Sequence, residues 1–387
     1  MRADQLEALR SRLADLGRAW TTADVGLALR HLGLVVSDQL VAEAVETLRR
    51  TSVGAGPLDD LLALEGVTDV LVNGPEQVWI DRGRGLELTG VRFADDAEVR
   101  ALAVRLAASV GRRLDEATPW VDARMADGTR VHAVLAALSA PGTCLSLRVP
   151  ARRSFSFADL VAAGSVGPLG QQVLPAMIAR RVPFLVSGGT GSGKTTLLAA
   201  LLGLVDPGER MVIVEDSREL DPRHPHVVRL EGRVANAEGT GRVSLTDLVR
   251  QSLRMRPDRV VLGEVRGAEL VDLLMAMNTG HEGGCGTVHA NSVADVPARL
   301  EALAALGGLG REACHAQVAS ALEVVVHVSR SDGRRRIGEI GVLRRSGAFV
   351  EVVPALATDE DGLEQTNEGW ARLAARCGIP RFAEAAA

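Results

Sequence analysis

The 387-residue sequence is poor in lysine and in aromatic residues. It contains no tyrosine, six phenylalanines and four tryptophans, and Lys194 is the single lysine among its 44 lysine and arginine residues. Few aromatic rings leave few platforms on which unpaired bases can stack, and a net charge of −5 gives no general attraction to a phosphate backbone. We therefore expect no direct nucleic-acid partner, although a local basic face is compatible with the composition.

Paired cysteines and long apolar runs are also lacking. The four cysteines, Cys144, Cys285, Cys314 and Cys377, are far apart and form no C-x-x-C pair, so we expect free thiols in a reducing compartment. No apolar run approaches the roughly 18–20 residues that span a bilayer, and the charged start MRADQLEALRSRL does not resemble a signal peptide. We expect no transmembrane segment, and any action at a membrane would require docking on another protein.

The first feature that the sequence predicts is an N-terminal helical segment, residues 1–51. Four leucines recur at the spacing that places them on one face of a helix: Leu6, Leu9, Leu13 and Leu16. A second amphipathic stretch, SDQLVAEAVETLRR, begins at Ser37, a residue type that is typical of a helix N-cap.

Residues 57–149 predict an α+β domain. The stretch 67–83 alternates apolar and polar residues around an Asn-Gly pair, which is typical of a hairpin. A helical stretch over about 95–112 and two further strands, TRVHAVLA and TCLSLRV, complete the domain. We interpret residues 150–159, PARRSFSFAD, as a linker and hinge.

Residues 160–387 alternate short apolar runs with helical stretches. Four such runs are found at 182–188, 210–216, 259–264 and 285–290. Continuous apolar runs separated by helices are typical of parallel strands that are buried on both faces. We therefore predict a parallel α/β domain that binds a nucleotide. Its tail, from EVVVHVS onward, predicts antiparallel strands, and the segment after about residue 357 is polar.

One of these runs leads into GGTGSGKT, residues 188–195, which matches G-x-x-x-x-G-K-[ST] between a strand and a helix. Glycines let successive backbone N–H groups surround phosphate oxygens, and the helix N-terminus adds partial positive charge. We predict that the nucleotide is held by Gly188, Gly189, Thr190, Gly191, Ser192, Gly193, Lys194, Thr195 and Thr196.

The position of the single lysine follows from this loop. The ammonium group of Lys194 is expected to reach the β- and γ-phosphates, and the Thr195 hydroxyl is expected to bind Mg²⁺. An ammonium is a compact point charge, whereas a guanidinium is a planar fork that fits a tight backbone cradle poorly. Arginine could therefore replace lysine elsewhere in this chain but not here.

Acidic residues follow two of the other apolar runs. Glu215, Asp216 and Glu219 follow one run, and Glu264 follows another. Ligands bind at the carboxyl ends of parallel strands, so carboxylates there can hold the water shell of a metal or orient an attacking water. Each acid taken alone is also typical of a helix cap or a solvated loop. Gly263 stands where a metal-binding aspartate is usual.

Two histidines, His281 and His289, lie in TGHEGGCGTVHANS. His289 ends the fourth apolar run and is expected to face the nucleotide. A structural role stays open for both residues. They are eight positions apart without an evident third ligand, so we expect no separate metal site.

The motifs together resemble the type II/type IV secretion ATPase superfamily. GGTGSGKTTLL, VIVEDSREL, LRMRPDRVVLGEVRGAE and TGHEGGCGTVHANS correspond to its Walker A motif, Asp box, atypical Gly-Glu Walker B motif and His box. The upstream stretches VTDVLVNGPEQVWIDRG, DEATPWVDARMADGTRVHA and LSLRVP are similar to the tight-adherence (Flp-type) pilus assembly ATPases. The absence of a tetra-cysteine module favours the same branch. The resemblance covers about residues 57–330.

This resemblance implies a RecA-like P-loop ATPase domain behind a PAS-like N-domain that closes over the nucleotide. It implies ATP and Mg²⁺ as ligands and a homohexamer docked in the cytoplasm on inner-membrane platform proteins. Hydrolysis would then drive pilin assembly or secretion. The implied catalytic residues are Glu219, Glu215, Glu264 and His289, with Thr195 and Glu264 on the metal and Arg124, Arg130 and Arg148 reaching the nucleotide.

Several alternatives stay open at this point. Glu219 is the preferred base for the attacking water, with Glu215 or Glu264 as alternatives. A conjugation or effector-secretion ATPase would carry almost the same motifs. The arginines of VRQSLRMRPDR are compatible with a DNA translocase, and a nucleotide-gated scaffold would bind ATP without hydrolysing it.

Overall fold

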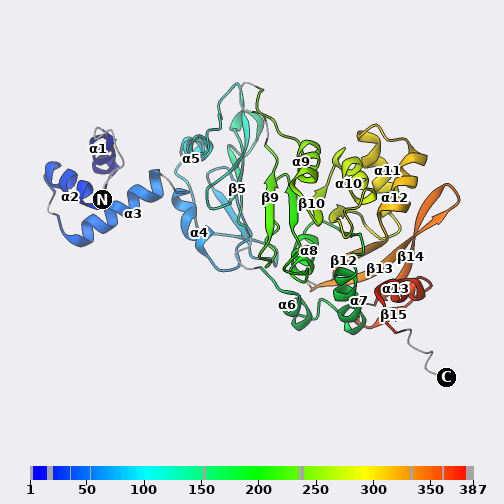
Figure 1. Cartoon of the computed structure of the whole chain (residues 1–387). Helices are drawn as coiled ribbons and strands as arrows, with labels where there is room; N and C mark the ends of the chain where they lie inside the picture. Colours follow the sequence, from blue (N-terminus) through cyan, green and yellow to red (C-terminus); the bar gives the residue numbers. More distant parts are fainter. Residues whose placement is uncertain are drawn as a thin grey trace. The chain divides into compact units, whose positions relative to one another are not determined.

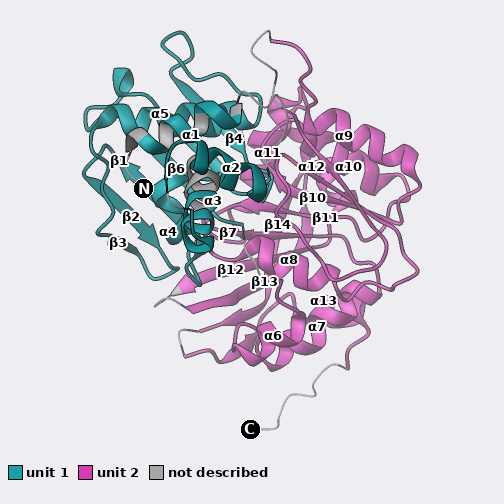
Figure 2. Ribbon diagram, turned by 90° about the vertical axis from the view of Figure 1, so that its left-hand side faces the viewer, with its two compact units in different colours: residues 1–151 teal, residues 152–387 magenta. Residues whose placement is uncertain are grey.

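The computed structural model describes residues 3–14, 21–34, 36–52, 54–150, 154–233, 235, 239–331, 334–359 and 361–380. The chain divides into two compact units, Met1–Ala151 and Arg152–Ala387 (Figure 2). Three parts of the predicted organisation lie outside the described residues: Leu16, positions 151–153 of the linker, and the end of the tail at 381–387.

The first unit begins with three helices, α1 (Ala3–Ala14), α2 (Thr22–His31) and α3 (Asp38–Ser52). They bury a small apolar cluster that includes Leu9, Leu13, Val25 and Leu29. The predicted cap is confirmed, because the Ser37 hydroxyl accepts a hydrogen bond from the backbone N–H of Leu40 at 3.1 Å.

The rest of this unit is a six-stranded antiparallel sheet in the order β3-β2-β1-β6-β5-β4. The hairpin and the helix predicted for this region are confirmed. Core side chains of α5 pack against alternate residues of the strands on one face of the sheet, as in an α+β domain. The elements are η1 (Gly56–Leu58), α4 (Asp59–Ala63), β1 (Asp69–Asn73), β2 (Gln77–Asp81), β3 (Leu86–Leu88), α5 (Asp96–Ser109), β4 (Trp120–Arg124), β5 (Arg130–Val134), η2 (Ala136–Leu138) and β6 (Cys144–Arg148).

The second unit is built on a nine-stranded sheet in the order β15-β14-β13-β12-β7-β11-β10-β8-β9. The four predicted strands β7, β8, β10 and β11 are parallel, as expected. Two further parallel strands, β9 and β12, extend the set at its two sides. The strands are β7 (Phe184–Gly188), β8 (Met211–Glu215), β9 (Val227–Glu231), β10 (Arg259–Val265), β11 (Cys285–His289), β12 (Val324–Ser331), β13 (Arg334–Ser346), β14 (Phe349–Thr358) and β15 (Glu364–Thr366).

Helices cover both faces of this sheet (Figure 1). Side chains of α7, α8 and α13 pack on one face, and those of α9, α10, α11 and α12 pack on the other. Strands buried from both sides explain the continuous apolar runs. The helices are α6 (Phe157–Ala162), α7 (Pro168–Ala179), α8 (Lys194–Leu202), α9 (Leu245–Ser252), η3 (Leu253–Met255), α10 (Glu269–Asn278), α11 (Val296–Leu306), α12 (Arg311–Ala321) and α13 (Trp370–Cys377).

The predicted antiparallel strands of the C-terminal region are confirmed for β13, β14 and β15, and β12 differs in part. The EVVVHVS stretch forms β12, which pairs in parallel with β7 and antiparallel with β13. Helix α12 precedes β12 and provides the crossover that a parallel connection requires. The C-terminal strands therefore belong to the same sheet as the four predicted parallel strands.

The segment after residue 357 is not simply polar. Helix α13 buries Trp370, Leu373 and Ala374 against the sheet. Glu364 of β15 accepts hydrogen bonds from two backbone N–H groups in the first turn of α7, where the helix dipole favours a negative charge. The predicted linker is also shorter at its end, because Ser156 caps α6, which begins at Phe157.

Candidate nucleotide site

The predicted phosphate loop connects β7 to α8. β7 ends at Gly188 and α8 begins at Lys194, so the loop leads directly into a helix N-terminus. Gly193 has φ 102°, in the left-handed region that favours glycine. A Cβ atom on Gly188 would come within 2.4 Å of the Val328 carbonyl oxygen. These positions require glycine to hold the loop against β12, and the open loop suits phosphate oxygens.

Lys194 is held inside the loop. Its Nζ donates to the carbonyl oxygens of Gly188 at 3.1 Å and Gly189 at 2.8 Å, and it lies 3.3 Å from Nδ1 of His289. The residue is only 7% exposed. Burial lowers the pKa of the ammonium, and Glu264 opposes that effect. The site therefore holds a point charge within a cradle of three acceptors.

Beyond Lys194, a chain of polar contacts runs along the carboxyl ends of the strands. Nε2 of His289 lies 2.7 Å from Oε1 of Glu264. Arg266 joins Oε2 of Glu264 at 2.6 Å and Oδ2 of Asp216 at 2.8 Å. An ammonium only donates hydrogen bonds, so Nδ1 of His289 accepts from Lys194 and the proton of the neutral ring is on Nε2. The strand ends of β7, β11, β10 and β8 are thereby linked.

Protonation states follow from this arrangement. Burial and the charge of Lys194 lower the pKa of His289, which favours the neutral ring. Burial raises the pKa of Glu264, but the Arg266 guanidinium, His289 and Lys194 outweigh that effect and hold it below its usual value. Glu264 is therefore a carboxylate whose Oε2 pairs with Arg266, while its buried Oε1 lies near His289 without a hydrogen bond from the described residues.

The sequence pattern does not predict Arg266 as a site residue, although it stands two residues after Glu264 in the same motif. Its backbone N–H and that of Gly267 both donate to Oε1 of Glu269, which is itself buried. These bonds fix the turn after β10. They direct the guanidinium between Glu264 and Asp216.

Glu215 occupies the space of the missing aspartate. It is only 3% exposed, and its Oε1 accepts from the backbone N–H groups of Glu219 and Leu220 at 3.0 Å each. A Cβ atom on Gly263 would lie 2.5 Å from Cγ of Glu215. Burial raises the pKa of Glu215. This geometry favours a role in positioning the loop that carries Glu219.

Glu219 itself is exposed at the edge of the same cluster. Its charge raises the pKa of Lys194 and of Arg266, so it lies within electrostatic reach of both. Thr195 and Thr196 are half-buried in the first turn of α8. In the described parts of the chain, no three or more His, Cys, Asp or Glu residues form a metal site on their own.

His281 lies apart from this cluster. It precedes β11, whereas His289 ends that strand, so the two occupy opposite ends of it. Its Nδ1 lies 3.2 Å from the carbonyl oxygen of Ala276 at the end of α10. The structural alternative is therefore favoured for His281.

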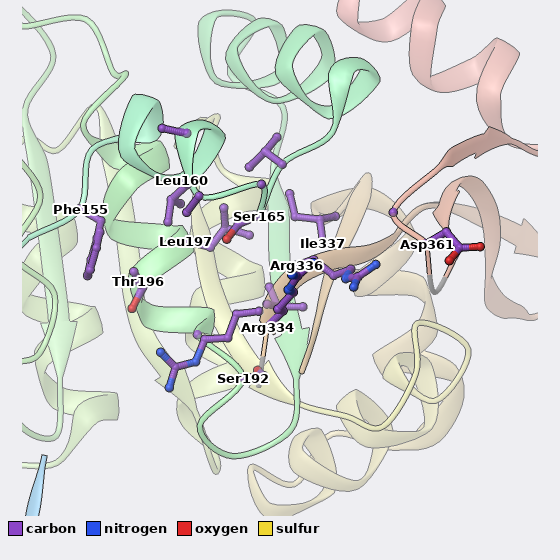
Figure 3. Close-up of a pocket in the computed structure, with 18 residues that line it drawn as sticks. Phe155, Leu160, Ser165, Ser192, Thr196, Leu197, Arg334, Arg336, Ile337 and Asp361 are labelled. Carbon is purple, nitrogen blue, oxygen red and sulfur yellow. The ribbon is translucent and has the colours of Figure 1, made fainter. Parts of the chain in front are cut away.

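A cavity of about 670 Å³ adjoins the other flank of the phosphate loop (Figure 3). Its volume lies in the range of small-molecule sites. Ser192, Gly193, Thr196 and Leu197 form the wall next to the loop, and Arg334, Arg335, Arg336 and Ile337 of β13 form another. Phe155 and Leu160 add apolar surface.

The predicted N-domain arginines share one row of the sheet in the first unit. The register places Arg124 of β4 opposite Arg130 of β5, and Arg130 opposite Arg148 of β6. Neighbouring residues such as Ala123 and Val131 enter the core with α5, so the arginines point to the other face. Arg148 is exposed and the other two are half-buried. Aligned cations on one face favour an anionic ligand.

A phosphate loop at a strand–helix junction, with carboxylates at neighbouring strand ends, defines the class of P-loop NTPases. The chain belongs to the type II/IV secretion system protein family, whose model matches residues 51–362. It is a nucleotide-binding secretion-system ATPase with a RecA-like C-terminal domain.

Two relatives illustrate the range of the family. A putative conjugal transfer protein of Mycobacterium tuberculosis is 53% identical over 332 residues, which cover 84% of this chain and 94% of the relative. The type IV secretion system protein PtlH of Bordetella pertussis is 33% identical over 72% of this chain and 91% of its own. The tight-adherence branch stays a prediction.

Solved structures agree in fold. The DotB ATPase of Yersinia pseudotuberculosis has a TM-score of 0.53 at 16% identity, covering 75% of this chain and 78% of its own. The pilus retraction motor PilT with bound ADP has a TM-score of 0.50 at 19% identity, covering 87% and 85%. These values support the two-domain architecture.

Across the described ranges, every helix is too short or too polar to traverse a bilayer.

The first prediction concerns the single lysine. Lys194→Arg keeps the charge but replaces a compact ammonium that fits among two carbonyls and a ring nitrogen. Losing a positioned phosphate contact costs about 3 kcal/mol in the transition state, so we expect ATP turnover to fall about a hundredfold. Steady-state phosphate release measures this, with an unchanged melting temperature as the control. Near-native turnover would exclude the steric explanation.

The second prediction concerns Glu215. Glu215→Gln keeps an acceptor for the two backbone N–H groups and removes a carboxylate whose ionisation burial disfavours. Because the folded-state pKa of Glu215 is raised, this residue binds fewer protons in the unfolded chain, and its contribution to stability falls as pH rises above about 4.5. We expect the melting temperature of the variant to equal or exceed that of the wild type near pH 7, with the difference shrinking toward pH 4.

Melting curves from about pH 4 to pH 8 measure this difference. Glu87→Gln makes the same chemical change at an exposed residue of β3 and is the control. A Glu215→Gln protein that is clearly less stable near pH 7 would show that the carboxylate is needed in its ionised form.

Proposed function

We propose that this ATPase is the Mg²⁺-dependent motor of a pilus assembly or type II/IV secretion machine. It works as a homohexamer in the cytoplasm, docked on inner-membrane platform proteins. The observation that carries the proposal is the chain of contacts from Lys194 through His289 and Glu264 to Arg266. Family membership supports a secretion role, because this chain of contacts uses the Walker A, Walker B and His-box residues.

In this proposal the loop and the strand ends divide the chemistry. Backbone N–H groups of residues 188–195 and the Lys194 ammonium hold the phosphates. Thr195 and Glu264 hold Mg²⁺, which supplies neutralising charge to the phosphates when bound. His289 keeps Glu264 and Lys194 at fixed separation. Glu219, exposed beside the cluster, orients the attacking water, and Glu215 fixes its loop.

The N-domain contributes cations from a separate unit. Developing charge on the transferred phosphoryl needs positive groups, and an added arginine is worth about 10³–10⁵ in rate in other P-loop enzymes. Arg124, Arg130 and Arg148 form a row that would present such groups when the domain closes over the nucleotide. Closure and hydrolysis are then coupled, as a motor requires.

A conjugal transfer role is the second candidate. The relatives of M. tuberculosis support it through their name and their 53% identity. It shares the site and the motor cycle with the leading proposal and differs in the cargo, which would include DNA handled by other components.

The third prediction tests the N-domain row. Arg124→Ala or Arg130→Ala should lower ATP turnover at least tenfold while changing ATP affinity less, because the interaction strengthens in the transition state. Arg100→Ala is the matched control, since Arg100 lies on α5 and pairs with Glu116. Turnover and equilibrium binding of a fluorescent ATP analogue are measured in parallel. Equal losses in all three variants would contradict a specific role of the row.

The fourth prediction tests docking. The purified chain should bind inner-membrane vesicles from its own cells and should not bind protein-free vesicles of the same lipids. Flotation on a density gradient measures the bound fraction. Protease treatment of the membranes should abolish binding, because the platform is a protein. Equal binding to protein-free vesicles would contradict docking on a platform protein.

A further inference from the structure

The C-terminal strands bring an arginine to the phosphate loop. Nε of Arg335, near the start of β13, donates to the carbonyl oxygen of Gly191 at 3.1 Å, across 144 residues of sequence. A Cβ atom on Gly193 would lie 3.2 Å from Cδ of Arg335. The side chain therefore lies directly against the loop.

Arg335 approaches from the flank opposite Lys194. In the sheet, β12 and β13 lie on one side of β7, and β11, β10 and β8 lie on the other. His289 and Glu264 belong to the second side, where the hydrolytic residues gather. The cavity belongs to the first side, because Arg335 and its neighbours in β13 line it together with Ser192 and Thr196.

The chemistry of this flank suits the inner part of a nucleotide. Apolar residues such as Leu160 and Leu197 line the cavity and would accommodate a nucleoside, while the loop amides would hold phosphates. A chain of phosphates that runs from the cavity toward Lys194 passes Arg335 first. Of the three guanidinium nitrogens of the exposed Arg335, only Nε has a hydrogen-bond partner among the described residues. A guanidinium pairs more strongly with phosphate than with a carbonyl oxygen.

We propose that Arg335 binds the α- and β-phosphates of the nucleotide and exchanges the Gly191 carbonyl for them on binding. The proposal rests on nucleotide binding by the phosphate loop. It makes the C-terminal hairpin part of the site. Because ADP and ATP share these phosphates, Arg335 holds both nucleotides and slows the release of ADP.

The fifth prediction measures nucleotide binding rather than hydrolysis. For Arg335→Ala in the full-length chain, we expect the dissociation constants of ADP and of non-hydrolysable ATP each to rise at least tenfold, to a similar extent. Arg335→Lys should recover part of the loss by restoring the charge. Titration calorimetry gives the affinities, and melting curves without nucleotide should stay within about 2 °C of the wild type.

Arg345→Ala is the matched control. Arg345 lies on the same strand, and its Nε donates to the Gly347 carbonyl oxygen at 3.2 Å, away from the loop. Unchanged ADP affinity in Arg335→Ala would overturn the proposal, and a loss confined to the ATP analogue would overturn the α/β assignment. A large fall in melting temperature without recovery in Arg335→Lys would show a structural role instead. Failure of the wild type to bind ADP would contradict nucleotide binding itself.

Discussion

The Lys194 ammonium, enclosed by two loop carbonyls and His289, is the interaction on which the site depends. It ties the loop after β7 to the end of β11, and His289 extends that link to β10. A buried cation of this kind is tolerable only when acceptors surround it. The ammonium still lies near the opening of the phosphate loop, so a bound anion would further stabilise its positive charge.

On the acidic side of the site, a glutamate from one strand fills the space of a carboxylate that is absent from another. A carboxylate that would ordinarily extend from β10 is absent at Gly263, and the side chain of Glu215 from β8 fills its space. Because Glu215 is buried and its carboxylate accepts hydrogen bonds from two backbone N–H groups, it fixes the conformation of the Asp-box loop. The carboxylates that face solvent or the loop are then Glu219 and Glu264, and the two have different surroundings.

Much of this arrangement could be predicted because its residues are local in sequence. The glycines, Lys194, His289 and Glu264 stand at the ends of apolar runs, and parallel strands bring such ends together. The role of Glu215 could not be seen, because the pattern shows an acid after a strand but not that its side chain turns inward. The role of Arg335 could not be predicted from the sequence, because its contact with the phosphate loop depends on the parallel pairing of β12 with β7. The order of the C-terminal strands decides that pairing, and no local pattern encodes it.

The enclosure of the single lysine has a practical consequence for covalent chemistry. Apart from the chain's α-amino group, this protein offers amine-directed reagents one target, and it lies in the phosphate loop. Burial lowers its pKa, so more of it is in the nucleophilic neutral form at a given pH than for an exposed lysine, while enclosure limits access. Side-chain acylation of this chain is therefore confined to a single loop, without background from other lysines.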